Sequence, residues 1–148
     1  MKRFLFNLIV LLFCSNSFAL DLVSVNVFAE DDAAEARQCN HSNSSTVAAV
    51  ESVFRQNRIK VDSNSPYYVY INTAILEIRP GYCSVSTRLF IYFTSNVNIP
   101  DKKFSKFLRT ELCTYTSLLI GNSGTISSRI NNDYRSFAEE CISKIEKK

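Results

Sequence analysis

The chain has 148 residues, of which 46% are hydrophobic and 21% charged, and its formal net charge is +3. This near-balance of charge gives no basis for nucleic-acid binding. With only three glycines and three prolines, a closed barrel built on tight turns is less favoured than a mixed α/β domain with a single core.

The first nineteen residues have the three parts of a secretory signal peptide: two basic residues, an apolar run over 4–13, and small residues at 17 and 19. The run is too short to span a bilayer, and no second one follows. Phe13 before Cys14 makes a poor lipid-attachment site. We therefore predict loss of 1–19, a secreted or periplasmic single domain over 20–148, and a net charge that falls to about +1. A bacterial periplasm and a eukaryotic secretory route both fit.

The first elements of the exported chain are a strand and a helix separated by a polar loop. Leu22–Phe28 alternates apolar and polar residues, as a strand does. Glu30–Ser45 is a loop with a short helical piece at Ala33–Arg37. Ser45 or Thr46 then caps a helix that ends near Asn57, with one apolar face formed by Val47, Val50 and Phe54.

Two alternating segments follow, Tyr67–Ile78 and Tyr82–Thr94, and the short Arg79-Pro80-Gly81 turn between them predicts an antiparallel hairpin. Phe107–Ile120 is a third strand. The last helix opens near Thr125 and carries one apolar stripe: Ile126, Ile130, Tyr134, Phe137, Cys141 and Ile145. The expected fold class is α+β, in the order β-α-β-β-β-α, with a mixed, mostly antiparallel sheet, two helices on one face and disulfide bonds.

Four cysteines remain after removal of the leader: Cys39, Cys83, Cys113 and Cys141. An even number of cysteines in an oxidising compartment predicts two disulfides. The sequence contains no Cys-x-x-Cys pair, so it gives no support for a zinc site or a redox-active site. Three connectivities are possible. The one we favour joins Cys83 to Cys113 across neighbouring strands, and Cys39 to Cys141.

No catalytic, metal or cofactor site is evident. The single histidine, His41, lies in a polar loop near Cys39, which we expect to be oxidised and therefore unavailable as a nucleophile. One histidine alone gives no support for a metal site. We therefore expect His41 to be a solvated loop residue. Glu77 and the pair Glu139-Glu140 show no sign of the burial that general acid–base chemistry needs. Residues 121–125 match no phosphate-binding motif, which favours a plain turn and helix cap over an anion site.

Two surfaces remain as candidates for binding. Tyr68 and Tyr70 alternate with core positions of their strand, so they lie on its opposite face, among other aromatics of the hairpin. The second candidate is a basic cluster: Lys102, Lys103, Lys106 and Arg109. It is either a solvated loop, which we favour, or a site that binds an anionic partner.

The order of elements resembles small periplasmic α/β modules. Strand Val23–Phe28, a helix, the strand opening Pro66-Tyr67-Tyr68, two further strands and a C-terminal helix are similar in layout to the TolB amino-terminal domain and to envelope-assembly accessory lipoproteins. The poor lipid-attachment site and the four cysteines depart from the lipoprotein members. This resemblance implies a non-catalytic, partner-binding role and assigns no functional residue.

We therefore expect a non-catalytic binding or accessory protein of the cell envelope, whose partner is another envelope protein. The alternatives are a periplasmic inhibitor or immunity-type protein and, from another class, a small hydrolase or nuclease. A deep polar cleft, or a buried Glu77 near His41, would favour the enzyme.

Overall fold

The structure is a computed structural model that describes residues 22–30, 34–98 and 105–146. The expected leader, Lys102 and Lys103 lie outside the described residues. The elements in chain order are β1 (Ser24–Ala29), α1 (Ala34–Gln38), α2 (Asn43–Gln56), β2 (Lys60–Val61), β3 (Tyr67–Arg79), β4 (Tyr82–Asn98), β5 (Ser105–Asn122) and α3 (Ser123–Glu146).

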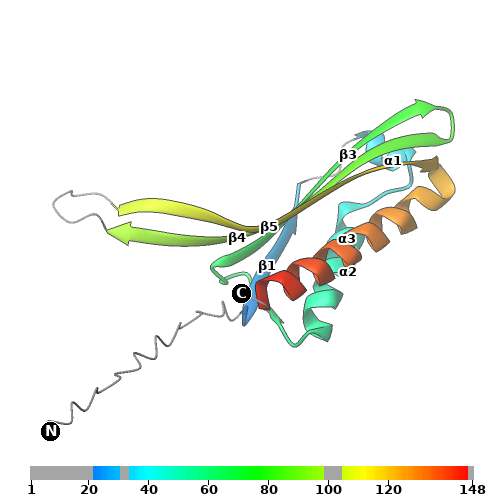
Figure 1. The fold of residues 1–148 in the computed structure, drawn as a ribbon. Helices are drawn as coiled ribbons and strands as arrows, with labels where there is room; N and C mark the ends of the chain where they lie inside the picture. The colour runs from blue at the N-terminus through cyan, green and yellow to red at the C-terminus, as the bar shows by residue number, and fades with distance from the viewer. Residues whose placement is uncertain (1–21, 31–33, 99–104, 147–148) are drawn as a thin grey trace, which may run out of the picture.

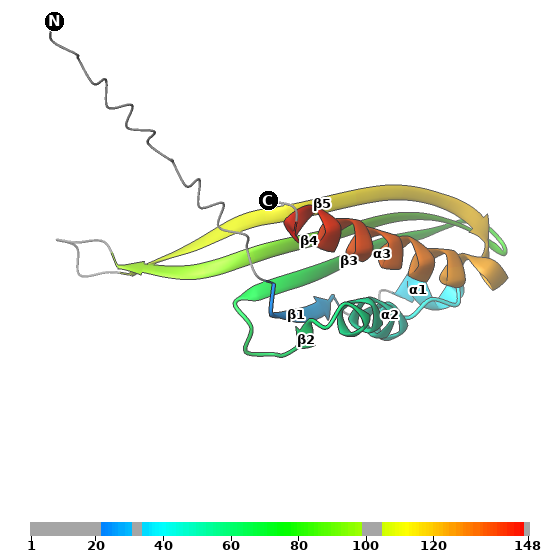
Figure 2. The same cartoon turned by 60° about the horizontal axis from the view of Figure 1, so that its bottom comes forward.

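The strands form one sheet in the order β2-β1-β3-β4-β5. Strand β1 is parallel to both of its neighbours, whereas β3, β4 and β5 form an antiparallel meander. Helices α2 and α3 lie on one face of this sheet (Figures 1 and 2). We call the helix-covered face the inner face and the opposite one the outer face. The α+β class, the mixed sheet and its mostly antiparallel pairing are therefore confirmed.

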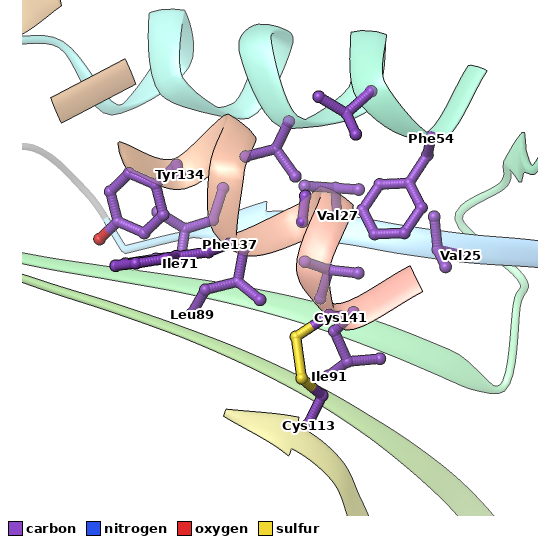
Figure 3. Packing of buried hydrophobic residues seen from close by; sticks show 14 of the residues in the cluster. Val25, Val27, Phe54, Ile71, Leu89, Ile91, Cys113, Tyr134, Phe137 and Cys141 are labelled. Atoms are coloured by element: carbon purple, nitrogen blue, oxygen red, sulfur yellow. A yellow bond between two sulfur atoms is a disulfide. The ribbon is translucent and has the colours of Figure 1, made fainter. Parts of the chain in front are cut away.

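The core lies between the inner face and the two long helices, as Figure 3 shows. The alternation predicted for the strands is observed: Val69 and Ile71 of β3 and Leu89 and Ile91 of β4 are buried. All six residues of the α3 stripe are also buried, and Ala138 and Ile142 join them. An apolar stripe of this width identifies the face of a helix that packs on a sheet.

The disulfide connectivity that we favoured is wrong. The structure joins Cys39 to Cys83 and Cys113 to Cys141. In the β4–β5 ladder Cys83 lies opposite Gly121 and Cys113 opposite Ile91, so the two cysteines stand eight ladder positions apart, about 26 Å. Each therefore bonds to an element that packs on the inner face instead.

Strands β4 and β5 continue beyond the rest of the sheet. Strand β3 begins at Tyr67, opposite Phe93. Apart from the hydrogen bonds of Thr94 to the Pro66 carbonyl, Thr94–Asn98 therefore pair only with Ser105–Arg109 of β5. These segments project as a two-stranded arm (Figure 1). Arg109 of the basic cluster lies on this arm. None of the helices within the described ranges is long and apolar enough to cross a bilayer.

Smaller differences have local causes. Helix α2 begins at Asn43 rather than beside Thr46, with Ser42 as its N-cap residue. The helix ends with Asn57 as its C-cap residue, close to the expected end, and Arg58 after it has a left-handed φ of 63°. Strand β2 was missed, because two residues leave no periodic pattern.

Candidate functional site

The outer face carries a cluster of five aromatic side chains, which we call the aromatic cluster: Phe28, Tyr68, Tyr70, Phe90 and Tyr92. They come from three adjacent strands, because β1, β3 and β4 each place alternate residues on this face. All five are partly exposed. Neither α2 nor α3 lies over them (Figure 2).

Register brings these rings into contact. Tyr68 lies opposite Tyr92, and Tyr70 opposite Phe90, in the β3–β4 ladder. Both pairs are stacked, with centroids 5.3 Å and 6.0 Å apart. Phe28 extends the cluster across β1, with its ring centroid 5.2 Å from that of Tyr70. Cross-strand aromatic pairs of this kind hold one another in a fixed arrangement.

Two arginines border the cluster. The Arg109 guanidinium lies 3.6 Å from the ring centroid of Tyr92, and that of Arg88 lies 5.2 Å from the centroid of Phe90. Arg109 reaches the ring because Leu112 is an extra residue in β5: Cys113 faces Ile91 while Glu111 faces Tyr92. Such a bulge shifts the alternation of the strand. Sequence reasoning placed Arg109 in a basic cluster and gave no sign of this contact.

Glu30, just after β1, borders the aromatic cluster beside Tyr70. Its carboxylate accepts hydrogen bonds from the Tyr70 hydroxyl and from the side-chain amide of Asn72. The bond to Glu30 raises the pKa of Tyr70 above 10.0, and burial raises the pKa of Tyr92 while the nearby Arg109 lowers it. Both phenols are therefore neutral hydrogen-bonding groups at physiological pH.

Farther along the outer face lies an exposed aliphatic patch: Leu76, Ile78, Leu118 and Ile120. Leu76 and Leu118 are 60% and 68% exposed. In the ladder Leu76 shares a row with Ser84 and Ile120, so the patch spans β3 to β5. The strand patterns contained these residues, but the sequence analysis did not single them out as a surface.

The residues weighed for catalysis come from three different parts of the fold, and His41 and Glu77 each have their own local partners. His41 is 4% exposed, so the expected solvated histidine is wrong; it bonds to the Asn43 side chain at the start of α2. Glu77 accepts a hydrogen bond from the backbone N–H of Gly81 and so holds the β3–β4 turn. Glu139 and Glu140 are exposed on α3.

At residues 121–125 the expected helix cap is present, but the expected separate turn is not, because β5 ends at Asn122 and α3 begins at Ser123. The side-chain oxygen of Asn122 accepts the N–H of Gly124 at 2.7 Å, which occupies the first turn of α3. Within the described residues no group of three or more His, Cys, Asp or Glu side chains could hold a metal ion.

Comparison with known proteins gives no family. No protein-family model matches the chain, and neither does the sequence of any curated protein. Among solved structures, a PelC dodecamer from Paraburkholderia phytofirmans is similar over 83% of each chain, at 11% identity and a TM-score of 0.39. A minor lipoprotein from Acinetobacter baumannii is similar over 85% of this chain and 91% of its own, at 10% identity and a TM-score of 0.27. Neither is a TolB domain, so that part of the resemblance stays a prediction.

Proposed function

We propose that this chain is a non-catalytic binding protein of an extracytoplasmic compartment, and that it binds another envelope protein through the outer face of its sheet. The observation that carries the proposal is the uncovered aromatic cluster. Tyrosine, phenylalanine and arginine are the residue types that protein interfaces favour, and here they are already stacked on a rigid sheet. Preordered side chains lose little entropy on binding.

The shape of the surface favours a protein over a small ligand. Small-molecule sites are concave and enclose most of their ligand, whereas the cluster lies on the face of an extended sheet (Figure 2). The thirteen residues of β3 cover about 43 Å, and β3, β4 and β5 over that length, about 4.8 Å apart, give a footprint of about 600 Å² before side-chain relief is added. A stable interface buries about 800 Å² per partner, so a partner would have to contact most of this face, including its projecting side chains.

The disulfides support an oxidising compartment. Both bonds are buried and join the sheet to elements on its inner face, Cys39 after α1 and Cys141 in α3. Such bonds form and persist in secreted and periplasmic proteins. The proposed leader over residues 1–19 would export the chain to such a compartment.

The test is recovery of a partner by the exported chain from an envelope extract, comparing the unaltered protein with the double variant Tyr68→Ser/Tyr70→Ser. We expect a specific partner band to fall at least about ten-fold, which corresponds to about 1.4 kcal/mol, within the range of interface hot spots. The matched control is Arg135→Ser/Glu139→Ser, which changes two exposed residues of α3 on the helical side. Equal recovery by the Tyr variant and the unaltered chain would contradict the proposal.

A further inference from the structure

The two edges of the sheet differ greatly. At one edge lies β2, with two residues, and at the other lies β5, with eighteen. Among the described residues no strand pairs with the edge of β5 that faces away from β4. Natural proteins shield long edges with prolines, charges or bulges, since a bare edge offers a row of peptide groups to another strand.

The charged residues and the bulge that shield β5 lie in its first half. Arg109, Glu111 and the bulge at Leu112 lie there, and bulges terminate strand pairing. The second half, Cys113–Asn122, contains neither a charge nor a proline. A second copy of this segment offers an edge of the same length, also without charge or proline, so the two can pair without placing like charges opposite each other.

The ladder shows which peptide groups face outward. Two N–H groups of β4 point toward β3. The Arg88 N–H donates to the Tyr134 hydroxyl, which itself donates to the Asn72 carbonyl, and the Thr94 N–H donates to the Pro66 carbonyl. Peptide groups alternate between the two sides of an antiparallel strand. The peptide groups of the odd-numbered residues of β4 therefore form hydrogen bonds with β5. The β5 residues opposite them after the bulge are odd-numbered as well, for example Tyr115 opposite Leu89.

The peptide groups left facing the edge are those of the even-numbered residues after the bulge. At the far end, the carbonyl of Ile120 accepts a hydrogen bond from the Arg129 side chain at 2.9 Å. This leaves a segment of available edge, bounded by the bulge on one side and by Arg129 on the other: Thr114, Thr116 and Leu118.

We propose that two copies of this chain associate by antiparallel pairing of their β5 edges, around a two-fold axis at Thr116. Thr116 then lies opposite its equivalent, and Thr114 opposite Leu118 of the second copy. Each opposed pair exchanges two backbone hydrogen bonds, so the seam holds about six. An isologous contact of this kind closes on itself, so the assembly is a dimer and not a fibre.

The pairing also contacts the exposed aliphatic patch. Leu118 projects from the outer face and is 68% exposed. Across the seam its neighbour on that face is Thr114 of the second copy, because directly opposed residues of an antiparallel pair project on the same side. The aromatic clusters stay uncovered, so dimer formation and partner binding use different surfaces.

The experiment is sedimentation velocity of the exported chain over a concentration series. The unaltered chain should show a concentration-dependent dimer. Leu118→Lys and Thr116→Pro should each raise the dimer dissociation constant at least about ten-fold, because one places a charge at the seam and the other removes an edge-facing N–H. Both variants should keep the unfolding midpoint of the unaltered chain to within a few degrees.

Two matched controls separate edge pairing from other contacts. Leu76→Lys changes a similarly exposed outer-face leucine on β3, away from the edge, and Thr116→Val keeps the N–H. Both should dimerise as the unaltered chain does. A monomer at every concentration would overturn the proposal, and so would a loss of dimer in Leu76→Lys equal to that in Leu118→Lys, since that would place the contact on the outer face.

Discussion

The Tyr134 hydroxyl joins α3 to the backbone of two strands, and its removal is the sharpest test of how the core is built. Tyr134 is fully buried. Its hydroxyl donates to the Asn72 carbonyl at 2.6 Å, accepts the Arg88 N–H at 3.2 Å, and lies 2.9 Å from Thr73 Oγ1. Asn72 and Arg88 are opposed in the β3–β4 ladder, so the hydroxyl bridges the two strands from the inner face, on which Figure 3 shows the Tyr134 ring.

We expect Tyr134→Phe to lower the free energy of unfolding by about 2–4 kcal/mol. The ring stays, so no large cavity forms. What is lost is a hydrogen-bonded bridge, and a buried backbone group left unpaired costs about 1–3 kcal/mol. Urea denaturation of both proteins at neutral pH measures the difference. A change below about 0.5 kcal/mol would refute the reasoning, because it would mean that the strands close directly without the hydroxyl.

The pH dependence gives the same bridge a second readout. Burial raises the pKa of Tyr134 from 10.0 to about 12, although hydrogen bonds from Thr73 and Arg88 act in the opposite direction. A raised pKa in the folded state gives stability that is complete below pH 10 and is lost as the pH rises toward 12. Between pH 8 and pH 11 the unaltered chain should therefore lose about 1.4 kcal/mol more than Tyr134→Phe does. Equal losses in the two proteins would show that the phenol is not the titrating group.

Two other predictions concern the core and the disulfides, and a third concerns the leader expected from the sequence. Phe137→Ala should cost about 3–5 kcal/mol, since its ring stacks on Tyr115 at 5.4 Å and meets Tyr134 edge-on; an unchanged denaturation midpoint would show that the helix face is misplaced. Proteolysis of the unreduced protein followed by mass spectrometry should yield peptides joined as Cys39–Cys83 and Cys113–Cys141, and a Cys83–Cys113 peptide would contradict the register of β4 and β5. The mass of the exported chain should match a start at Leu20, whereas a retained leader or a lipid mass on Cys14 would exclude the proposed processing.

Periodicity predicted the parts of the fold that depend on one face of one element. The α3 stripe from Ile126 to Ile145 and the buried Val69 and Ile71 follow from spacing alone, because a helix or strand that covers a core must repeat its apolar residues with its own period. The same reasoning placed Tyr68 and Tyr70 on the outer face.

Features that depend on register could not be predicted in this way. The disulfides depend on which residues of β4 and β5 are opposed, and the alternation within each strand does not determine which residues of two strands face each other. The contact of Arg109 with Tyr92 depends on the extra residue at Leu112, which the pattern of β5 does not reveal. His41 is buried and bonds to Asn43, the first residue of α2, which begins three or four residues before the start expected from the sequence.

The most direct test of partner binding through the outer face is site-specific photo-crosslinking in the envelope. A benzophenone amino acid in place of Tyr68 lies within the aromatic cluster, and the same group in place of Arg135 lies on the exposed side of α3. We predict one discrete adduct of higher mass from position 68, weakened at least about ten-fold by Tyr70→Ser, and none from position 135. An adduct from position 135 alone, or none from position 68 in the intact envelope, would contradict the claim that this face binds a partner.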